Sequence, residues 1–500
     1  MRTARHVAAV DLGAESGRVA KVSFDGERLS VDVAHRFSHT VHTTDGILRW
    51  GFDDLRTGVL TGLQALAAGD DPISSVGTDT WGVDYGLLDA SGELVDEPTC
   101  YRDPRQPRAR ARILEEVGPS RVYDATGVQI IDINTLFALA SDATDHPERL
   151  KRAERLVMMP DVFHHLLSGS TVTEYTAAST SGCYDVAAGR WATALLDELG
   201  IPTHMLPDVV APGTDVGALM PEYAVGGLRG ARVVLPPGHD TASAVVGTPL
   251  ASPDGLYISS GTWSLAGIEI PRPIISDRTR IANITNEGGY EDTIRFLRNV
   301  AGLWIIQSCR REWAARGRAL SYPELVARAE EVEALNSVIN PDAPEFLDGR
   351  DTPARIQDYC RLTGQPVPRS VSEIARCVFD SLALSYRHVV ADLRQITGLA
   401  IPSVNIVGGG SNNELLSQLT ADAVGTPVVC GPVEATALGN AAVQLVALGE
   451  LDGLADIRQV ISASAAPSTF LPRTHERWDA AYATFTRLVA TDRSRQGLGV

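Results

Sequence analysis

Asp240 stands in the segment Gly238-His239-Asp240-Thr241, where a predicted strand turns into a predicted helix. Phosphoryl transfer often uses a carboxylate that accepts the proton of the attacking hydroxyl, and an aspartate at the start of a helix can be placed for this. Aspartate is also a preferred N-cap residue, so capping alone would explain it equally well. Asp240 is therefore the candidate general base, with a purely structural cap as the alternative.

A strand–turn–strand segment near the start of the chain has the composition of a phosphate-binding loop. The apolar run 7–10 ends at Asp11, and a loop with Gly13, Ser16 and Gly17 leads into a second strand. Glycines let backbone N–H groups approach an anion, and the amides of a turn form a concavity that binds anions. The alternative is an ordinary hairpin that opens a domain, and this segment alone does not decide between them.

Later segments repeat the combination of a strand and a glycine-containing turn. Residues 255–267, GLYISSGTWSLAG, again read as strand, small polar turn and strand. Residues 404–407 have the composition of a buried strand and enter the triple glycine 408–410. The repetition indicates a duplicated architecture in which each half opens with a phosphate-like hairpin.

Several common catalytic and nucleotide-binding motifs are absent from the sequence. Neither of the two lysines, Lys21 and Lys151, follows a glycine, which excludes a Walker A loop. No G-x-G-x-x-G follows a strand with an acidic residue at the required spacing, and neither G-x-S-x-G nor H-E-x-x-H occurs. His35, His39 and His42 have ligand-like spacing but lie in a strand-to-loop stretch without a supporting carboxylate trio, so we interpret them as surface residues.

Composition limits the partners of the chain. Its 500 residues carry 44 basic and 62 acidic side chains, a formal charge of −18, which argues against nucleic acid or an anionic membrane as the main partner. No apolar run reaches the roughly 18 residues of a spanning helix, and the N-terminus has no apolar leader, so we expect a cytoplasmic protein. The 6 cysteines contain no C-x-x-C pair. Cys360 and Cys377 flank a short loop and could approach each other, but reduced thiols are the better interpretation.

The order of predicted elements is α/β twice over. Apolar runs and alternation predict strands over 29–36, 47–50, 75–80, 83–88, 231–235, 404–407 and 427–430. Helical spacing predicts helices over 53–68, 104–117, 190–199, 299–316, 372–393, 413–424, 434–448 and 476–491, and a helical pattern over 134–169 in which Pro160 opens a helix. We expect a two-domain α/β protein, divided into 1–246 and 247–500, with a ligand cleft between the domains.

At this level of detail the chain resembles a known family over nearly its whole length. The segments that carry the resemblance occur in order: VDLGAESGR (10–18), DTWGVDYGLLD (79–89), YRDPR (101–105), HDTASAV (239–245), YISSGTWSL (257–265), ITNEGG (284–289), LRNVAGLWIIQ (297–307), VGGGSNNELLSQLTADAVG (407–425) and GPVEATALGN (431–440). They are similar to those of the FGGY carbohydrate kinases, whose two domains have the actin-like, ribonuclease H-like fold. The resemblance implies transfer of the ATP γ-phosphoryl group to a sugar hydroxyl, with Mg²⁺.

The resemblance also implies roles for individual residues. Asp240 would be the proton acceptor, and Asp11 would meet Mg²⁺ through water. The sugar would contact Gly82, His239, Asp240, Thr241 and Asn299. ATP would contact the first loop at Ala14, Glu15, Ser16, Gly17 and Arg18, and further along the chain Thr262, Gln307 and Gly409. An interval of eight residues would place Asn299 and Gln307 on one face of the predicted helix 299–316.

The acceptor implied by the resemblance is the O1 hydroxyl of L-rhamnulose, a small ketose. L-fuculose, D-xylulose and glycerol are alternatives within the family, and a sugar-sensing protein without catalysis is the alternative outside it. We expect a monomer or small homo-oligomer. Glu15 departs from the family pattern, which has a small residue at this position. The departure matters because a carboxylate beside the ATP phosphates repels them unless it turns outward or helps to hold Mg²⁺.

Overall fold

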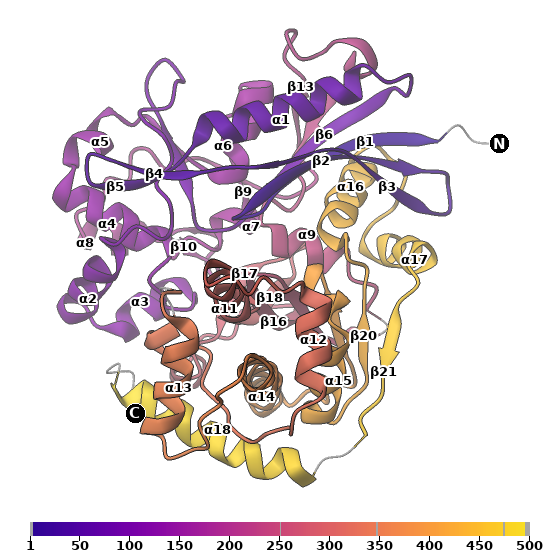
Figure 1. Ribbon diagram of the computed structural model, residues 1–500. Coiled ribbons are helices and arrows are strands. Elements are labelled where there is room, and N and C mark those ends of the chain that lie inside the picture. Colours follow the sequence, from indigo (N-terminus) through magenta and orange to yellow (C-terminus); the bar gives the residue numbers. More distant parts are fainter. Residues whose placement is uncertain (1–3, 251, 347–348, 474–475, 496–500) are drawn as a thin grey trace. The chain divides into compact units, whose positions relative to one another are not determined.

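The computed structural model describes residues 4–250, 252–346, 349–473 and 476–495 (Figure 1). Within them the chain forms two compact units. The first comprises residues 1–249, 269–296 and 434–465, and the second comprises 250–268, 297–433 and 466–500. The chain therefore first crosses between units near residue 249, close to the predicted junction at 246/247. It returns to the first unit twice, with segments that the sequence prediction placed in the second domain.

The first unit is built on a sheet with the strand order β13-β14-β6-β1-β2-β3. Its central strand β1 (Arg5–Leu12) pairs antiparallel with β2 (Ser16–Phe24) and parallel with β6 (Ile73–Thr80). The remaining strands of this sheet are β3 (Leu29–Ser38), β13 (Asp215–Ala218) and β14 (Arg232–Val234). The predicted hairpin at the start of the chain is thus the centre of the sheet.

Helices cover both faces of β1. Ala8, Val10 and Leu12 pack on α1 (Phe52–Ala67), whereas Val7 and Ala9 pack on α16 (Ala435–Ala447). Alternation along the strand places Asp11 on the same face as Val7 and Ala9. The first polar residue of the loop is therefore directed toward α16, an element more than four hundred residues later in the chain.

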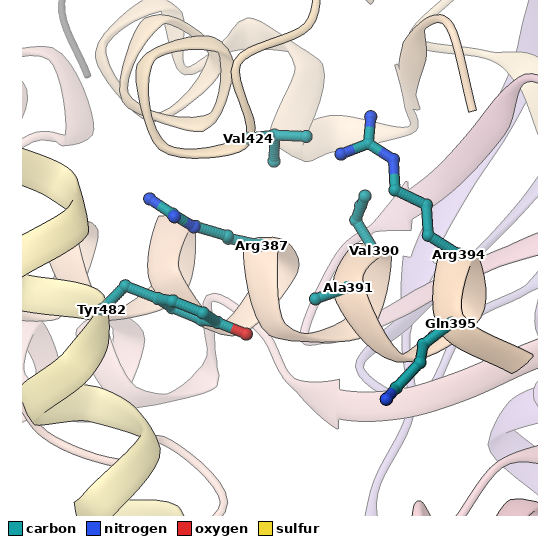
Figure 2. A pocket seen from close by; sticks show the side chains of 7 residues that line it. All are labelled: Arg387, Val390, Ala391, Arg394, Gln395, Val424 and Tyr482. Carbon is teal, nitrogen blue, oxygen red and sulfur yellow. The ribbon is translucent and has the colours of Figure 1, made fainter. Parts of the chain in front are cut away.

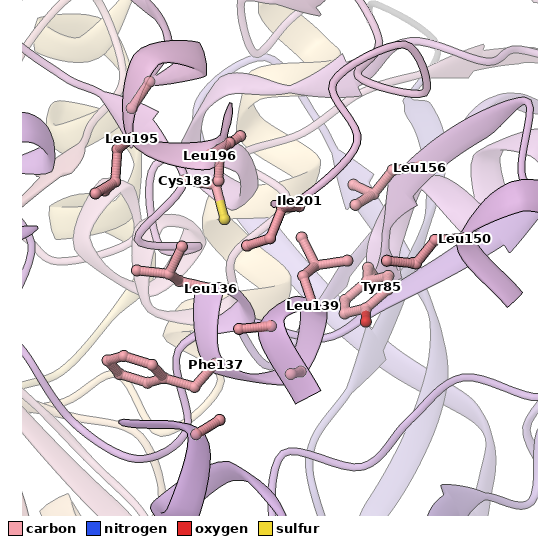
Figure 3. Close-up of a cluster of buried hydrophobic side chains, with 14 of the residues drawn as sticks. Tyr85, Leu136, Phe137, Leu139, Leu150, Leu156, Cys183, Leu195, Leu196 and Ile201 are labelled. Atoms are coloured by element: carbon pink, nitrogen blue, oxygen red, sulfur yellow. The ribbon is translucent and has the colours of Figure 1, made fainter. Parts of the chain in front are cut away.

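A helical subdomain follows β6 and has its own core, in which Tyr85, Leu136, Phe137 and Leu139 are buried (Figure 3). Its elements are β7 (Tyr85–Leu88), α2 (Gln106–Glu116), α3 (Pro119–Thr126), α4 (Thr135–Asp145), α5 (Pro147–Arg152) and β8 (Arg155–Met158). The next helix, α6 (Met159–Ser168), packs instead on β6 of the main sheet. The continuous helical pattern predicted over 134–169 is wrong at β8. This buried segment pairs antiparallel with β7, and a strand so short is decided by its partner rather than by periodicity.

The rest of the first unit consists of short elements and the segments that return to it. They are β4 (Val41–Thr44), β5 (Ile47–Trp50), β9 (Thr173–Glu174), α7 (Tyr175–Ala178), β10 (Tyr184–Asp185), β11 (Arg190–Trp191), α8 (Thr193–Glu198), β12 (Val209–Val210), α9 (Asp240–Val246), α10 (Asp277–Ile281), β17 (Thr285–Gly288) and α17 (Leu454–Ser464). The helix predicted over 190–199 is shorter than expected, because its first two residues pair as β11 with β10.

In the second unit β16 (Trp263–Ile270), β15 (Leu256–Ser260), β19 (Val404–Val407), β20 (Val428–Cys430) and β21 (Ser468–Phe470) are neighbours in that order. Its helices are α11 (Trp304–Ala315), α12 (Tyr322–Glu330), α13 (Thr352–Leu362), α14 (Val371–Thr397), α15 (Glu414–Val424) and α18 (Glu476–Arg495). The long α14 packs on α12, α15 and α18. The mixed α/β fold expected from the sequence is confirmed in both units.

The predicted helix 299–316 is wrong in its first turn. Asn299 lies in β18 (Ile294–Ala301), and α11 begins only at Trp304. Gly302 separates the two elements, and a Cβ atom there would lie 2.6 Å from the backbone carbon of Trp263. The chain must pass this close to the β15–β16 hairpin, which ends the strand before the helix starts. Asn299 and Gln307 therefore do not share a helix face.

All 6 cysteines are free thiols. The thiols of Cys360 and Cys377 nevertheless contact each other. No helix among the described residues is long and apolar enough to cross a membrane.

Candidate active site

Asp240 is the first residue of α9, and His239 occupies the N-cap position. Its Oδ1 atom accepts a hydrogen bond from the Thr241 backbone N–H at 2.6 Å. The side chain is 30% exposed, so a ligand can reach the carboxylate. Burial raises the pKa of Asp240, the neighbouring His239 opposes this, and the charge of Asp11 adds to it. A carboxylate with a raised pKa that a ligand can reach suits proton transfer.

The loop that carries this aspartate is hydrogen-bonded to the start of α7 and to Glu174, its N-cap residue. The backbone N–H of Gly238 donates to Glu174 Oε2 at 2.8 Å, and that of His239 donates to Thr176 Oγ1 at 3.2 Å. Gly82 lies against the same loop, because a Cβ atom at residue 82 would be 3.2 Å from His239 Nε2. The structure therefore brings together the predicted sugar contacts Gly82, His239, Asp240 and Thr241.

The first loop ends in an ion-pair network. Register in the β1–β2 hairpin places Asp11 opposite Arg18, and Arg18 Nε donates to Asp11 Oδ2 at 2.9 Å. The same guanidinium forms an ion pair with Glu434, which directly precedes α16. Burial opposes the charge of Arg18, but the two carboxylates raise its pKa above the ordinary value. Glu15 is exposed at the turn.

Asp79 is a buried carboxylate that the sequence analysis did not single out. It lies opposite Asp11 in the parallel register of β1 and β6. Asn440 Nδ2 donates to Asp79 Oδ2 at 2.6 Å, and Gln444 Nε2 donates to Asn440 Oδ1 at 2.6 Å. The other oxygen of Asp79 is buried and has no hydrogen-bond partner among the described residues. Asp79 is the first residue of the segment DTWGVDYGLLD, one of those that carry the family resemblance, and this position was the only sign in the sequence that it could be functional.

Asp79 makes the stability of the protein depend on pH. Burial raises its pKa well above 3.8, and the charges of Asp11 and Asp240 add to the shift. The folded state then binds a proton that the unfolded state releases, so the free energy of unfolding falls as pH rises above 3.8. We predict that Asp79→Asn weakens this fall, as measured by urea unfolding of both proteins between pH 5 and 8 without Mg²⁺. Equal slopes for the variant and the wild type would contradict the prediction.

Aromatic residues connect the first loop to Gly82. His39 Nε2 lies 2.9 Å from the carbonyl oxygen of Gly13, and its ring stacks on Trp81 with 5.6 Å between centroids. Trp81 and Trp50 both donate their indole N–H to Asp84 Oδ2, at 2.7 and 2.6 Å. The interpretation of His39 as a surface histidine is therefore wrong. Burial lowers its pKa, because the ring is packed between the loop and the indoles.

The predicted nucleotide contacts Thr262, Gln307 and Gly409 lie in the second unit, as does Asn299. The turn between β15 and β16 adjoins the start of α11, since the N–H of Trp304 donates to the Thr262 carbonyl at 3.1 Å. Gln307 lies on the first turn of that helix. The glycine loop 408–410 adjoins the same turn, because a Cβ atom at Gly410 would lie 2.0 Å from Ser260 Oγ. Thr262, Gln307 and Gly409 are thus carried by adjoining segments.

Other candidate sites hold none of the predicted residues. A cavity of about 420 Å³ in the second unit is lined by Arg387, Val390, Ala391, Arg394, Gln395, Val424 and Tyr482 (Figure 2). In the part of the chain that the structure describes, no group of three or more His, Cys, Asp or Glu side chains is arranged as a metal site.

Two family models match the chain. The N-terminal domain of the FGGY family of carbohydrate kinases matches residues 6–247, and the C-terminal domain of that family matches residues 256–448. Curated relatives include the rhamnulokinase of Bacteroides thetaiotaomicron, 40% identical over 96% of this chain and 99% of that protein. The rhamnulokinase of Pectobacterium atrosepticum is 41% identical over 99% of this chain and 98% of that protein.

Solved structures show the same fold at low sequence identity. A ligand-bound xylulose kinase from Lactobacillus acidophilus has a TM-score of 0.81 at 16% identity, covering 99% of this chain and 98% of that one. A Plasmodium falciparum glycerol kinase with ADP has a TM-score of 0.78 at 15% identity, covering 98% of each chain.

Proposed function

Because the chain belongs to the FGGY family of carbohydrate kinases, we propose that it transfers the γ-phosphoryl group of ATP to the O1 hydroxyl of L-rhamnulose. The observation that carries this proposal is Asp240, a reachable carboxylate with a raised pKa beside His239 and Gly82. The names of the two relatives support L-rhamnulose as the acceptor. ATP supply in the cytoplasm makes that compartment the expected place of action.

The proposed acceptor contacts are Gly82, His239, Thr241 and Asn299. Because residue 82 is a glycine, there is space beside His239 Nε2. A Cβ atom at this position would lie 3.2 Å from Nε2 and reduce that space. Asp240 accepts the O1 proton as the oxygen attacks the phosphorus, which makes O1 a better nucleophile in the transition state. The raised pKa brings Asp240 nearer to the working pH, so its conjugate acid holds the proton until the product leaves.

The proposed ATP contacts belong to both units. In the first unit they are Ala14, Glu15, Ser16, Gly17 and Arg18. In the second they are Thr262, Gln307 and Gly409. Arg18 is held by Asp11 and Glu434, so its guanidinium has a defined orientation before ATP arrives. A Cβ atom at Gly17 would lie 2.5 Å from the Phe37 ring, so a larger residue there would displace that ring. The exposed side chain of Glu15 can turn away from the phosphates.

The residues present fit a divalent cation that is bound through water. Asp11 supplies the hard carboxylate oxygens that Mg²⁺ prefers, and Asp79, opposite it in the strand register, has one buried oxygen that lacks a hydrogen-bond partner among the described residues. Asp11 would hold Mg²⁺ through water. When bound, Mg²⁺ would neutralise charge on the transferred group. It would also offset the repulsion between Asp11 and Asp79.

The acceptor is tested by measuring sugar-dependent ADP release with L-rhamnulose, L-fuculose, D-xylulose and glycerol. We expect kcat/KM to be highest for L-rhamnulose, because uniform ATP contacts leave discrimination to the sugar contacts. A higher value for another sugar would move the assignment to that substrate within the family. Sugar binding without ADP release from any of them would instead favour a sensor.

A further inference from the structure

The ring of His239 lies between two carboxylates. Its Nε2 atom is 3.4 Å from Asp240 Oδ1, and its Nδ1 atom is 3.4 Å from Glu287 Oε2. Glu287 lies in β17, within the segment ITNEGG that the sequence analysis quoted but gave no role. Its side chain is 4% exposed, so the carboxylate faces His239 from inside the protein and cannot itself reach a ligand in solution.

Arg295 keeps Glu287 ionised. Its NH1 atom lies 3.1 Å from Glu287 Oε2, and its Nε donates to the carbonyl oxygen of Gly288 at 2.7 Å. Burial opposes the charge of Glu287, but Arg295 and His239 lower its pKa below the ordinary value. A buried ion pair adds little net stability because both charges are desolvated. The pair therefore calls for an explanation other than stability.

We propose that Glu287 is a positioning residue that accepts the Nδ1–H of His239 and so leaves the Nε2 lone pair to accept a hydrogen bond from a second hydroxyl of the sugar. A neutral imidazole has one donor and one acceptor nitrogen. An ionised Glu287 can only accept, so it favours the tautomer with the proton on Nδ1. Asp240 Oδ1 lies at the same distance from Nε2 but already accepts the Thr241 backbone N–H. This step rests on the proposed function, because it takes a sugar as the ligand of His239.

The arrangement creates two acceptors that need two donors. With Nδ1 protonated, neither His239 Nε2 nor ionised Asp240 can donate to the other, although they are 3.4 Å apart. A ligand with neighbouring hydroxyl groups satisfies both: one hydroxyl gives its proton to Asp240 and the other donates to Nε2. Recognition and proton acceptance are thereby assigned to adjacent side chains, and the orientation of both depends on Glu287.

The charged groups that face this histidine come from three elements. Asp240 approaches from α9, Glu287 from β17, and Arg295 acts through Glu287 from β18. Asp11 and Asp79 lie on β1 and β6. The charge of Asp11 raises the pKa of Asp240, and the charges of Asp11 and Asp240 add to the raised pKa of buried Asp79. A doubly protonated His239 between its two carboxylates is the competing state, and it would offer the sugar a donor instead of an acceptor.

The tautomer is read directly by ¹⁵N NMR of the full-length, histidine-labelled protein, with His239 assigned from its absence in His239→Gln. We expect a protonated Nδ1 and a lone pair on Nε2 in the absence of sugar. A proton on Nε2, alone or with one on Nδ1, would overturn the proposal. This measurement involves no substrate, so its result is independent of which sugar the enzyme uses.

The kinetic test compares Glu287→Gln with the double variant Glu287→Leu/Arg295→Met, which removes both buried charges together so that neither is left unpaired. Glutamine keeps an acceptor oxygen, so its KM for L-rhamnulose should stay near the wild-type value. The double variant should raise that KM by about tenfold, the equivalent of one lost hydrogen bond, with the KM for ATP unchanged. An unchanged sugar KM in the double variant would overturn the proposal.

Asp380→Asn is the matched control. Asp380 is a buried carboxylate in the second unit that pairs with Arg376 at 2.9 Å. Its loss should leave both the His239 tautomer and the KM for the sugar unchanged, whereas a parallel change in both variants would reduce the role of Glu287 to general stability. Failure of the wild type to phosphorylate L-rhamnulose would reject the proposed acceptor. The NMR measurement of the tautomer would not be affected by that result.

Discussion

Replacing Asp240 with asparagine is expected to lower kcat by about 10²- to 10⁴-fold while the sugar still binds. Asparagine has the same shape and can still accept the Thr241 backbone N–H that Oδ1 accepts at 2.6 Å, so the start of α9 should be preserved. It cannot take up the O1 proton. The loss should therefore appear in kcat, measured by coupled ADP release, with the sugar dissociation constant from calorimetry close to that of the wild type.

Asp215→Asn is the control for this experiment. Asp215 is an exposed carboxylate of the same unit that pairs with Arg232 at 2.8 Å, and its replacement should leave kcat unchanged. Near-normal turnover of Asp240→Asn would remove Asp240 from the role of base. Loss of sugar binding together with turnover would instead make it mainly a binding residue.

Replacing Gly439 with alanine is expected to destabilise the first unit by about 3 kcal/mol, at the upper end of the usual cost of overpacking. Gly439 lies in α16, where a Cβ atom would come within 1.8 Å of the Ser243 carbonyl oxygen of α9 and 2.8 Å of the Gly247 backbone nitrogen. Gly247, at the end of α9, is packed equally closely on α16, since a Cβ atom there would lie 2.0 Å from the Ala435 carbonyl oxygen. The two glycines let the helix backbones touch.

The consequence extends to catalysis because α9 begins with Asp240. Separating α9 from α16 would move the candidate base relative to Asp79, which α16 holds through Asn440. Urea unfolding gives the loss of stability, and kcat measured on the remaining folded protein should fall as well. Gly69→Ala is the control, since its Cβ atom would meet only an ordinary contact at 3.4 Å. Equal unfolding free energies for the two variants would contradict the close-packing argument.

Sequence patterns predicted the strands and turns of the fold well where the signal was local. The buried strand 404–407 and the strand 47–50 have the predicted bounds. The prediction failed where a distant partner decided the conformation. β8 is a strand because β7 pairs with it, and residues 299–301 are extended because Gly302 must pass close to the β15–β16 hairpin. Local periodicity carries no record of either contact.

The candidate site divides in the same way. The glycine-containing loops, Asp11 before the first of them and Asp240 at the start of a helix were all visible in the sequence, because each depends on the conformational preferences of a few consecutive residues. The surroundings of His39 were missed. A half-buried ring between Gly13 and Trp81 has the same local sequence pattern as an exposed one.

The turns that could bind an anion and the carboxylate that could accept a proton are visible in the sequence alone, since turns and helix starts are local. The side chains that surround them depend on the tertiary fold. Glu434 reaches Arg18, and Asn440 reaches Asp79, across more than three hundred and fifty residues of chain. Glu287 faces His239 from β17. Electrostatic interactions act through space, so the ionisation of these carboxylates depends on which side chains the fold buries beside them.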